Sequence, residues 1–139
     1  MKKYFTLEEA QKSLSEVKEI VRRLLESKTA LDLLKSVEVE YTEDYSGNYD
    51  ELNFTKINKE FHKLSYELFS RIEELEQRGC VLKDINEGLV DFFSLFDGRE
   101  ILLCWKYGEE KIDYWHEISD GFTGRKPINV LIKKENKQL

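Results

Sequence analysis

An apolar seam with helical spacing runs through the first quarter of the chain. Leu7, Leu14 and Val21 recur every seven residues, and a second set follows the same interval: Ala10, Val17, Leu24 and Leu31. Residues at this spacing share one face of an α-helix, so the pattern predicts a helix from residue 7 to about residue 35. Thr6 and Glu9 match a capping box at its start. A single helix ~40 Å long cannot bury its own seam, so it needs a partner.

The partner is predicted over residues 53–78. Its apolar residues are spaced by three or four: Phe54, Ile57, Phe61, Leu64, Leu68, Ile72 and Leu75. Gly79 then provides a helix stop. We expect the two helices to pair antiparallel through an acidic loop over residues 36–52. Asp44, Ser46, Asn48 and Asp50 alternate oxygen ligands within that loop, but its glycine and closing glutamate do not fit a calcium-loop pattern.

Beyond Gly79 the pattern changes to short apolar runs separated by turn residues. The runs predict strands over residues 80–83, 89–93, 100–107 and 112–118, and connections this short make neighbouring strands antiparallel. The predicted class is α+β, with two long antiparallel helices followed by a roughly four-stranded antiparallel β-meander packed on them. We expect one domain over 1–139, with a helical hairpin at 6–79, the meander at 80–118 and a C-terminal loop and tail at 119–139.

Charge and composition exclude several classes of function. The net charge of -6 over 139 residues argues against nonspecific nucleic-acid binding. No run approaches the ~20 apolar residues needed to span a bilayer, and the first residues lack the apolar core of a signal peptide. Cys80 and Cys104 are too few for a disulfide framework, which favours free thiols and a cytoplasmic protein.

Strand register determines which polar side chains meet. If Asp97 and Gly98 form a two-residue hairpin loop and residues 108–110 a three-residue loop, Asp91 pairs with Cys104, Cys104 with Tyr114, and Leu102 with His116. Two groups then form on opposite faces of the sheet. One comprises Asp91, Cys104, Tyr114 and His116, and the other comprises Arg99, Trp105, Trp115 and Glu117.

Two kinds of site are suggested by these groups. His116 with Asp91, Cys104 or Glu117 has the donor types that hold zinc or another divalent transition metal. The alternatives are a core cysteine, a histidine that only hydrogen bonds to a neighbour, and a Cys–His nucleophile with no identified third group. The chain has no CxxC, HxxxH or HExxH spacing.

The second kind of site is an anion site in the glycine-containing segment 121–127. Arg125 and Lys126 supply positive charge there, and Arg99 joins them if the strand order brings it close. Trp105 and Trp115 are further candidate ligand-contacting residues, or simply core aromatics. The alternative for Arg125 is an ion pair with a surface carboxylate.

Both faces of the predicted sheet carry large apolar residues. Phe93, Leu95 and Leu102 lie on one face, whereas Phe92 and Ile101 lie on the other with the tryptophans. Two helices cover only one face well, so the other needs a second subunit, a ligand or the C-terminal loop. This argument predicts a homodimer.

Several short motifs resemble the family known as domain of unknown function 2203. They are the opening FTLEEA at residues 5–10, LKD at 82–84, GLVDF at 88–92, DGRE at 97–100, LCW at 103–105, YWHE at 114–117 and GF, GR and Pro127 in the last segment. The resemblance implies a small soluble protein of bacteria or archaea without an assigned activity, and it supplies no catalytic residues.

The sequence therefore favours a noncatalytic binding or assembly protein. A metal-binding protein or metalloenzyme centred on His116 is one alternative, and a small-anion-binding protein using Arg99 and Arg125 is the other. The sequence assigns no catalytic residue, substrate or reaction, and the metal of the first alternative would be a divalent transition metal such as zinc.

Overall fold

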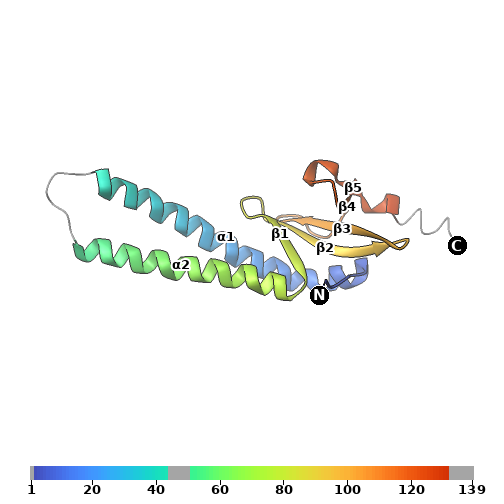
Figure 1. The fold of residues 1–139 in the computed structure, drawn as a ribbon, viewed down its shortest axis with the longest axis horizontal. Helices are drawn as coiled ribbons and strands as arrows, with labels where there is room; N and C mark the ends of the chain where they lie inside the picture. Colours follow the sequence, from blue (N-terminus) through green and yellow to red (C-terminus); the bar gives the residue numbers. More distant parts are fainter. Residues whose placement is uncertain (1, 44–50, 132–139) are drawn as a thin grey trace.

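The computed structural model describes residues 2–43 and 51–131, and its first two elements form a helical hairpin. Helix α1 covers Leu7–Glu43 and helix α2 covers Glu51–Gln77, running antiparallel to it (Figure 1). The predicted loop over 36–52 was too long, because both helices continue into it. Residues 36–43 contain neither glycine nor proline, so nothing in that stretch stops the helix. Residues 44–50, with the alternating oxygen pattern, lie outside the described residues.

The helix start is the predicted capping box. The backbone N–H of Glu9 donates to Thr6 Oγ1, and the backbone N–H of Thr6 donates to Glu9 Oε1, each over 3.1 Å. These bonds lower the pKa of the Glu9 carboxyl, because they favour its charged form. Two otherwise unpaired donors are thereby satisfied at the first turn of α1.

The second half of the chain forms a five-stranded antiparallel sheet with its strands in chain order. The strands are β1 (Cys80–Asp84), β2 (Leu89–Phe96), β3 (Arg99–Lys106), β4 (Tyr114–Glu117) and β5 (Lys126–Pro127). The prediction of a loop over 121–127 was wrong in part, since this segment holds the 3-10 turn η1 (Phe122–Gly124) and β5. A two-residue strand containing proline has no periodicity by which the sequence could reveal it.

The predicted register is confirmed. Asp91 pairs with Cys104, Leu102 with His116, and Cys104 with Tyr114. The β2–β3 turn explains the first pairing, because Asp97 and Gly98 both have positive φ angles, 55° and 72°. That conformation is typical of the type I′ turn, which matches the twist of a two-residue hairpin.

The β3–β4 connection is wider than predicted. Ladder pairing stops at Cys104 and Tyr114, whereas the predicted strands continued to residues 107 and 112. Ile112 instead contacts α1: the Gln11 side chain donates to the Ile112 carbonyl (3.1 Å) and accepts from its N–H (3.0 Å). These two bonds replace the ladder and tie the loop to the helix.

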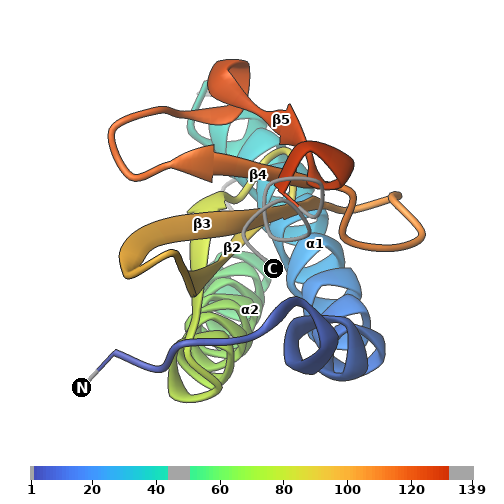
Figure 2. The same cartoon turned by 90° about the vertical axis from the view of Figure 1, so that its right-hand side faces the viewer.

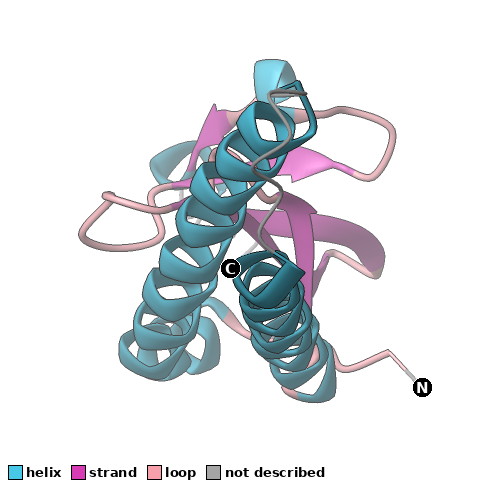
Figure 3. Cartoon of the chain, turned by 90° about the vertical axis from the view of Figure 1, so that its left-hand side faces the viewer, coloured by secondary structure: helices cyan, strands magenta, loops and turns pink. Residues whose placement is uncertain are grey.

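The core lies between the hairpin and one face of the sheet. Seen end-on, both helices lie on the same side of the strands (Figure 2), and from the far end of the hairpin they stand in front of them (Figure 3). The buried cluster takes the α1 seam together with inward-facing sheet residues: Val90, Phe92, Ile101, Leu103, Trp105 and Trp115. This arrangement leaves the opposite face of the sheet for the segment after β4.

Candidate metal centre

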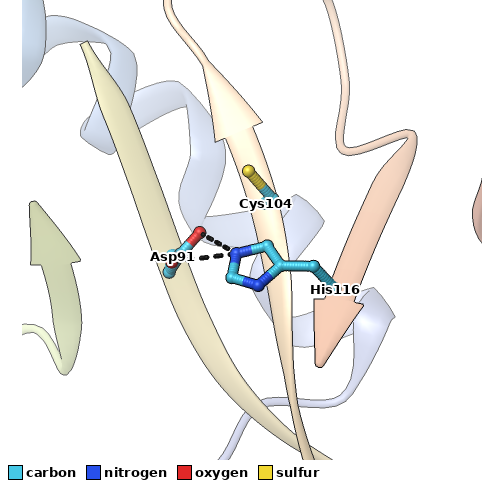
Figure 4. A group of neighbouring side chains, drawn as sticks. All are labelled: Asp91, Cys104 and His116. Carbon is cyan, nitrogen blue, oxygen red and sulfur yellow. Dashed lines mark hydrogen bonds and ion pairs between the residues drawn. The ribbon is translucent and has the colours of Figure 1, made fainter. Parts of the chain in front are cut away.

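Three potential metal ligands meet on the sheet face opposite the helices. Asp91 comes from β2, Cys104 from β3 and His116 from β4, so each strand contributes one side chain (Figure 4). One ligand atom from each lies within 4.8 Å of the other two. Among the residues that the structure describes, this is the one such group of three. The group follows from the confirmed register, since cross-strand neighbours on one face approach closely.

The hydrogen bonds of His116 define which ring nitrogen faces Asp91. Nδ1 lies 2.8 Å from the backbone carbonyl oxygen of Glu117. A carbonyl only accepts, so Nδ1 carries the hydrogen. Nε2 lies 3.2 and 3.1 Å from the two carboxylate oxygens of Asp91 (dashed in Figure 4). A lone pair and a carboxylate repel each other unless a proton or a metal ion lies between them.

All three side chains are almost completely buried. Asp91 is 1% exposed, Cys104 2% and His116 3%. Burial raises the pKa of the Asp91 carboxyl above its usual value, while His116 opposes that rise. Burial, with the neighbouring Asp91 carboxylate, raises the pKa of the Cys104 thiol to about 12. Without a bound cation, Cys104 is therefore a thiol at neutral pH.

A pocket of about 310 Å³ leads to the three ligands. Its walls include Lys83 from β1 and Asp120, Gly121 and Phe122 from the segment after β4. That segment is held by Arg125, whose guanidinium lies 4.1 Å from the Tyr114 ring centroid and 4.8 Å from that of Phe122. The sequence predicted that a second subunit, a ligand or the C-terminal loop would cover this face of the sheet. In the structure, the segment after β4 covers part of it.

Glu117 does not join the three ligands. Strand alternation places its side chain on the face that carries Ile101, with which it pairs. Its carboxylate lies 3.1 Å from Arg99 and 3.7 Å from Lys126. Its contribution to the centre is the backbone carbonyl that accepts from His116.

The three cations of the predicted anion site divide into two groups, because Arg99 and Lys126 both approach Glu117 whereas Arg125 has other partners. Arg125 donates to Glu109 Oε1 (2.6 Å) and to the carbonyl of Cys104 (3.3 Å). Arg99 begins β3, five residues and roughly 16 Å from Cys104 along the strand. The structure therefore gives the two arginines different partners at opposite ends of β3.

The two tryptophans lie in the buried cluster on the helix-facing side of the sheet. The indole N–H of Trp105 donates to the Glu109 carbonyl over 2.9 Å. Trp115 Nε1 is buried and has no hydrogen-bond partner among the described residues. Neither tryptophan lines the pocket that leads to Asp91, Cys104 and His116.

The model of one family, described as an uncharacterized conserved protein (DUF2203), matches residues 3–128. The chain belongs to the DUF2203 family. The match spans both helices, all five strands and the three residues of the candidate centre, so the centre lies within the DUF2203 region. No curated protein and no solved structure matches the chain.

Within residues 2–43 and 51–131 of this DUF2203 chain, none of the helices has the length and apolar character needed to cross a membrane. The two long helices are amphipathic, with their apolar seams in the core.

Lys83, Asp84 and Asp120 line the pocket of the DUF2203 centre, and sequence reasoning missed all three as site residues. Val81 pairs with Asp91, so strand alternation places Lys83, two residues later, on the same face. The β1–β2 register then shifts before Asp84, and an irregularity of that kind changes which face the following side chains take. The LKD motif was the available signal, but the register of β1 against β2 was not predicted.

Proposed function

We propose that this protein binds one divalent transition-metal ion, with zinc preferred, through Asp91, Cys104 and His116. Carboxylate, thiolate and imidazole together are a donor set typical of zinc. The proposed role is binding rather than chemistry, in line with the noncatalytic reading favoured by the sequence.

The observation that carries the proposal is the orientation of His116. The Glu117 carbonyl fixes the proton on Nδ1, so Nε2 presents its lone pair to the Asp91 carboxylate inside the protein. Metal-binding histidines commonly donate their second ring nitrogen to a carbonyl in this way, which sets the tautomer and the ring orientation.

Distances and charge also support a metal ion. Ligand atoms in a tetrahedral zinc site lie roughly 3.3–3.6 Å apart, given zinc–ligand bonds of about 2.0–2.3 Å. The Nε2–carboxylate distances are 3.1 and 3.2 Å, and a side-chain movement of about 1 Å would bring the sulfur within range. A dication with one thiolate and one carboxylate is electrically neutral, which removes the cost of burying separate charges.

The alternatives make different use of the same residues. In a purely structural reading, Asp91 and His116 share a proton and Cys104 fills space beside them. A Cys–His nucleophile is disfavoured, because both His116 nitrogens are occupied by other groups and the thiol pKa is about 12. Neither alternative needs the pocket that leads to the three side chains.

Native mass spectrometry after zinc addition and desalting tests the proposal. We expect one zinc per chain in the wild-type protein and none in His116→Ala. Glu117→Gln is the matched control: it changes the neighbouring residue but keeps the carbonyl that orients His116, so it should bind zinc as the wild type does. Folding of each variant is checked by circular dichroism. A folded His116→Ala protein that keeps its zinc would refute the proposed site.

We further propose a homodimer and a cytoplasmic location. Leu95 and Ile118 remain 54% and 49% exposed, which leaves apolar surface that a second copy could cover. A reduced Cys104 ligand fits a reducing compartment. The same native spectra report whether the chain is a dimer.

A further inference from the structure

We propose that the metal keeps one coordination position open to the pocket, and that this position takes a small monoanion such as a carboxylate, with Lys83 as its counter-charge. This inference rests on the proposed metal binding and goes beyond it, because a closed structural metal site would take no such ligand.

The number of donors argues for an open position. Asp91, Cys104 and His116 form a group of three, and no fourth His, Cys, Asp or Glu of the described residues joins them. Structural zinc sites have four protein ligands, whereas sites that take an external ligand have three and leave the fourth to water or a small molecule.

The pocket provides the path to that position. It reaches all three ligands and holds about 310 Å³, roughly ten times the volume a water molecule occupies in the liquid. That is near the lower end of small-molecule sites, so the pocket fits a ligand of a few heavy atoms with its water. Phe122 provides an aromatic wall, and the ring is held by the Arg125 guanidinium 4.8 Å away.

Lys83 is the one cation among the residues that line the pocket. Burial raises the pKa of the Asp91 carboxyl, and the Lys83 ammonium opposes that rise through its charge. Among the described residues, no carboxylate forms an ion pair with Lys83. The dication with its thiolate and carboxylate is neutral, so a negative charge on a ligand would be met by the Lys83 ammonium.

The other charged pocket residues restrict the ligand further. Asp84 Oδ1 accepts from the backbone N–H groups of Asn86 and Glu87, which fixes this carboxylate in the β1–β2 turn. Asp120 adds a second carboxylate to the wall. Two carboxylates against one lysine leave the pocket wall with a net negative charge, so an anion depends on the metal ion and Lys83 for its binding, and a multiply charged anion is disfavoured.

Cobalt(II) substitution gives a direct test, because its visible spectrum changes when a ligand enters the coordination sphere. The cobalt-loaded protein is titrated with azide and with acetate. We expect spectral changes that saturate, and a roughly fivefold weaker affinity for both anions in Lys83→Gln, the size of a favourable solvent-exposed ion pair. Lys106→Gln is the matched control: Lys106 pairs with Glu87 and lies 5.5 Å from the Phe122 ring, but it does not line the pocket.

The outcomes separate this inference from the proposed metal site. Saturable spectral changes that weaken in Lys83→Gln and not in Lys106→Gln support it. Stoichiometric cobalt binding with no response to either anion overturns it and leaves the metal site intact. Equal affinity in all three proteins overturns the role of Lys83. If no cobalt binds, the metal site and the inference fall together.

Discussion

At the scale of single residues, His116 is held by two contacts of different kinds. Its Nδ1–H donates to a neutral backbone carbonyl, and its Nε2 meets a buried carboxylate. The first contact is local to β4 and survives substitution of the neighbouring side chain. The second contact joins β4 to β2, and its nature depends on what lies between His116 Nε2 and the Asp91 carboxylate. With a proton there, the two side chains form a hydrogen bond that only supports the fold. With a metal ion there, both side chains are ligands.

These protonation states make metal binding depend on pH. Without metal, Cys104 holds a proton up to a pKa of about 12. Zinc binds the thiolate and replaces that proton, so a higher pH favours binding. We expect affinity to rise about tenfold per pH unit near neutrality, as one released proton requires. Zinc titration against a competing chelator at pH 6.5 and 7.5 measures it.

Cys104→Ser provides the control for that titration. Its hydroxyl is a poor zinc ligand and does not give up a proton near neutrality, so the variant should bind more weakly and lose the pH dependence that the thiol contributes. An affinity of the wild-type protein that does not change with pH would show that Cys104 does not bind zinc as a thiolate.

At the scale of elements, the segment after β4 holds the pocket in place. Arg125 is its anchor: the side chain is only 12% exposed, stacks on Tyr114 and bonds to both Glu109 and the Cys104 carbonyl. Sequence reasoning suggested this arginine as an anion ligand, with pairing to a carboxylate as the alternative. Which of these two roles Arg125 takes depends on the position of Glu109. That position follows from the β3–β4 loop, which is wider than the sequence predicted.

Arg125→Ala should therefore destabilise the fold. It removes the charge-assisted hydrogen bonds to Glu109 and to the Cys104 carbonyl, for an expected loss of about 2 kcal/mol in the free energy of unfolding. Urea denaturation measures this loss. Lys126→Ala is the control, because the neighbouring Lys126 is exposed and its change should stay within about 0.5 kcal/mol. Equal effects of the two substitutions would contradict the anchoring role of Arg125.

At the scale of the whole molecule, a helical hairpin covers one face of a meander and leaves the other for the site (Figure 1). The helices and the register could be predicted, because apolar periodicity and the Asp97-Gly98 turn are local signals. The grouping of Asp91, Cys104 and His116 followed from that register. Lys83 was not predicted as a site residue, because the sequence did not give the register of β1 against β2. Strand β5 could not be predicted, since a two-residue strand depends on tertiary contacts.

X-ray absorption at the zinc edge tests most directly whether three strands place three ligands on one metal ion. We expect one sulfur neighbour at about 2.3 Å, with the remaining neighbours nitrogen or oxygen at about 2.0–2.2 Å. The sulfur signal should disappear in Cys104→Ser and persist in Cys80→Ser, because Cys80 is a buried thiol on the other face of the sheet. A zinc shell without sulfur in the wild-type protein would contradict the account.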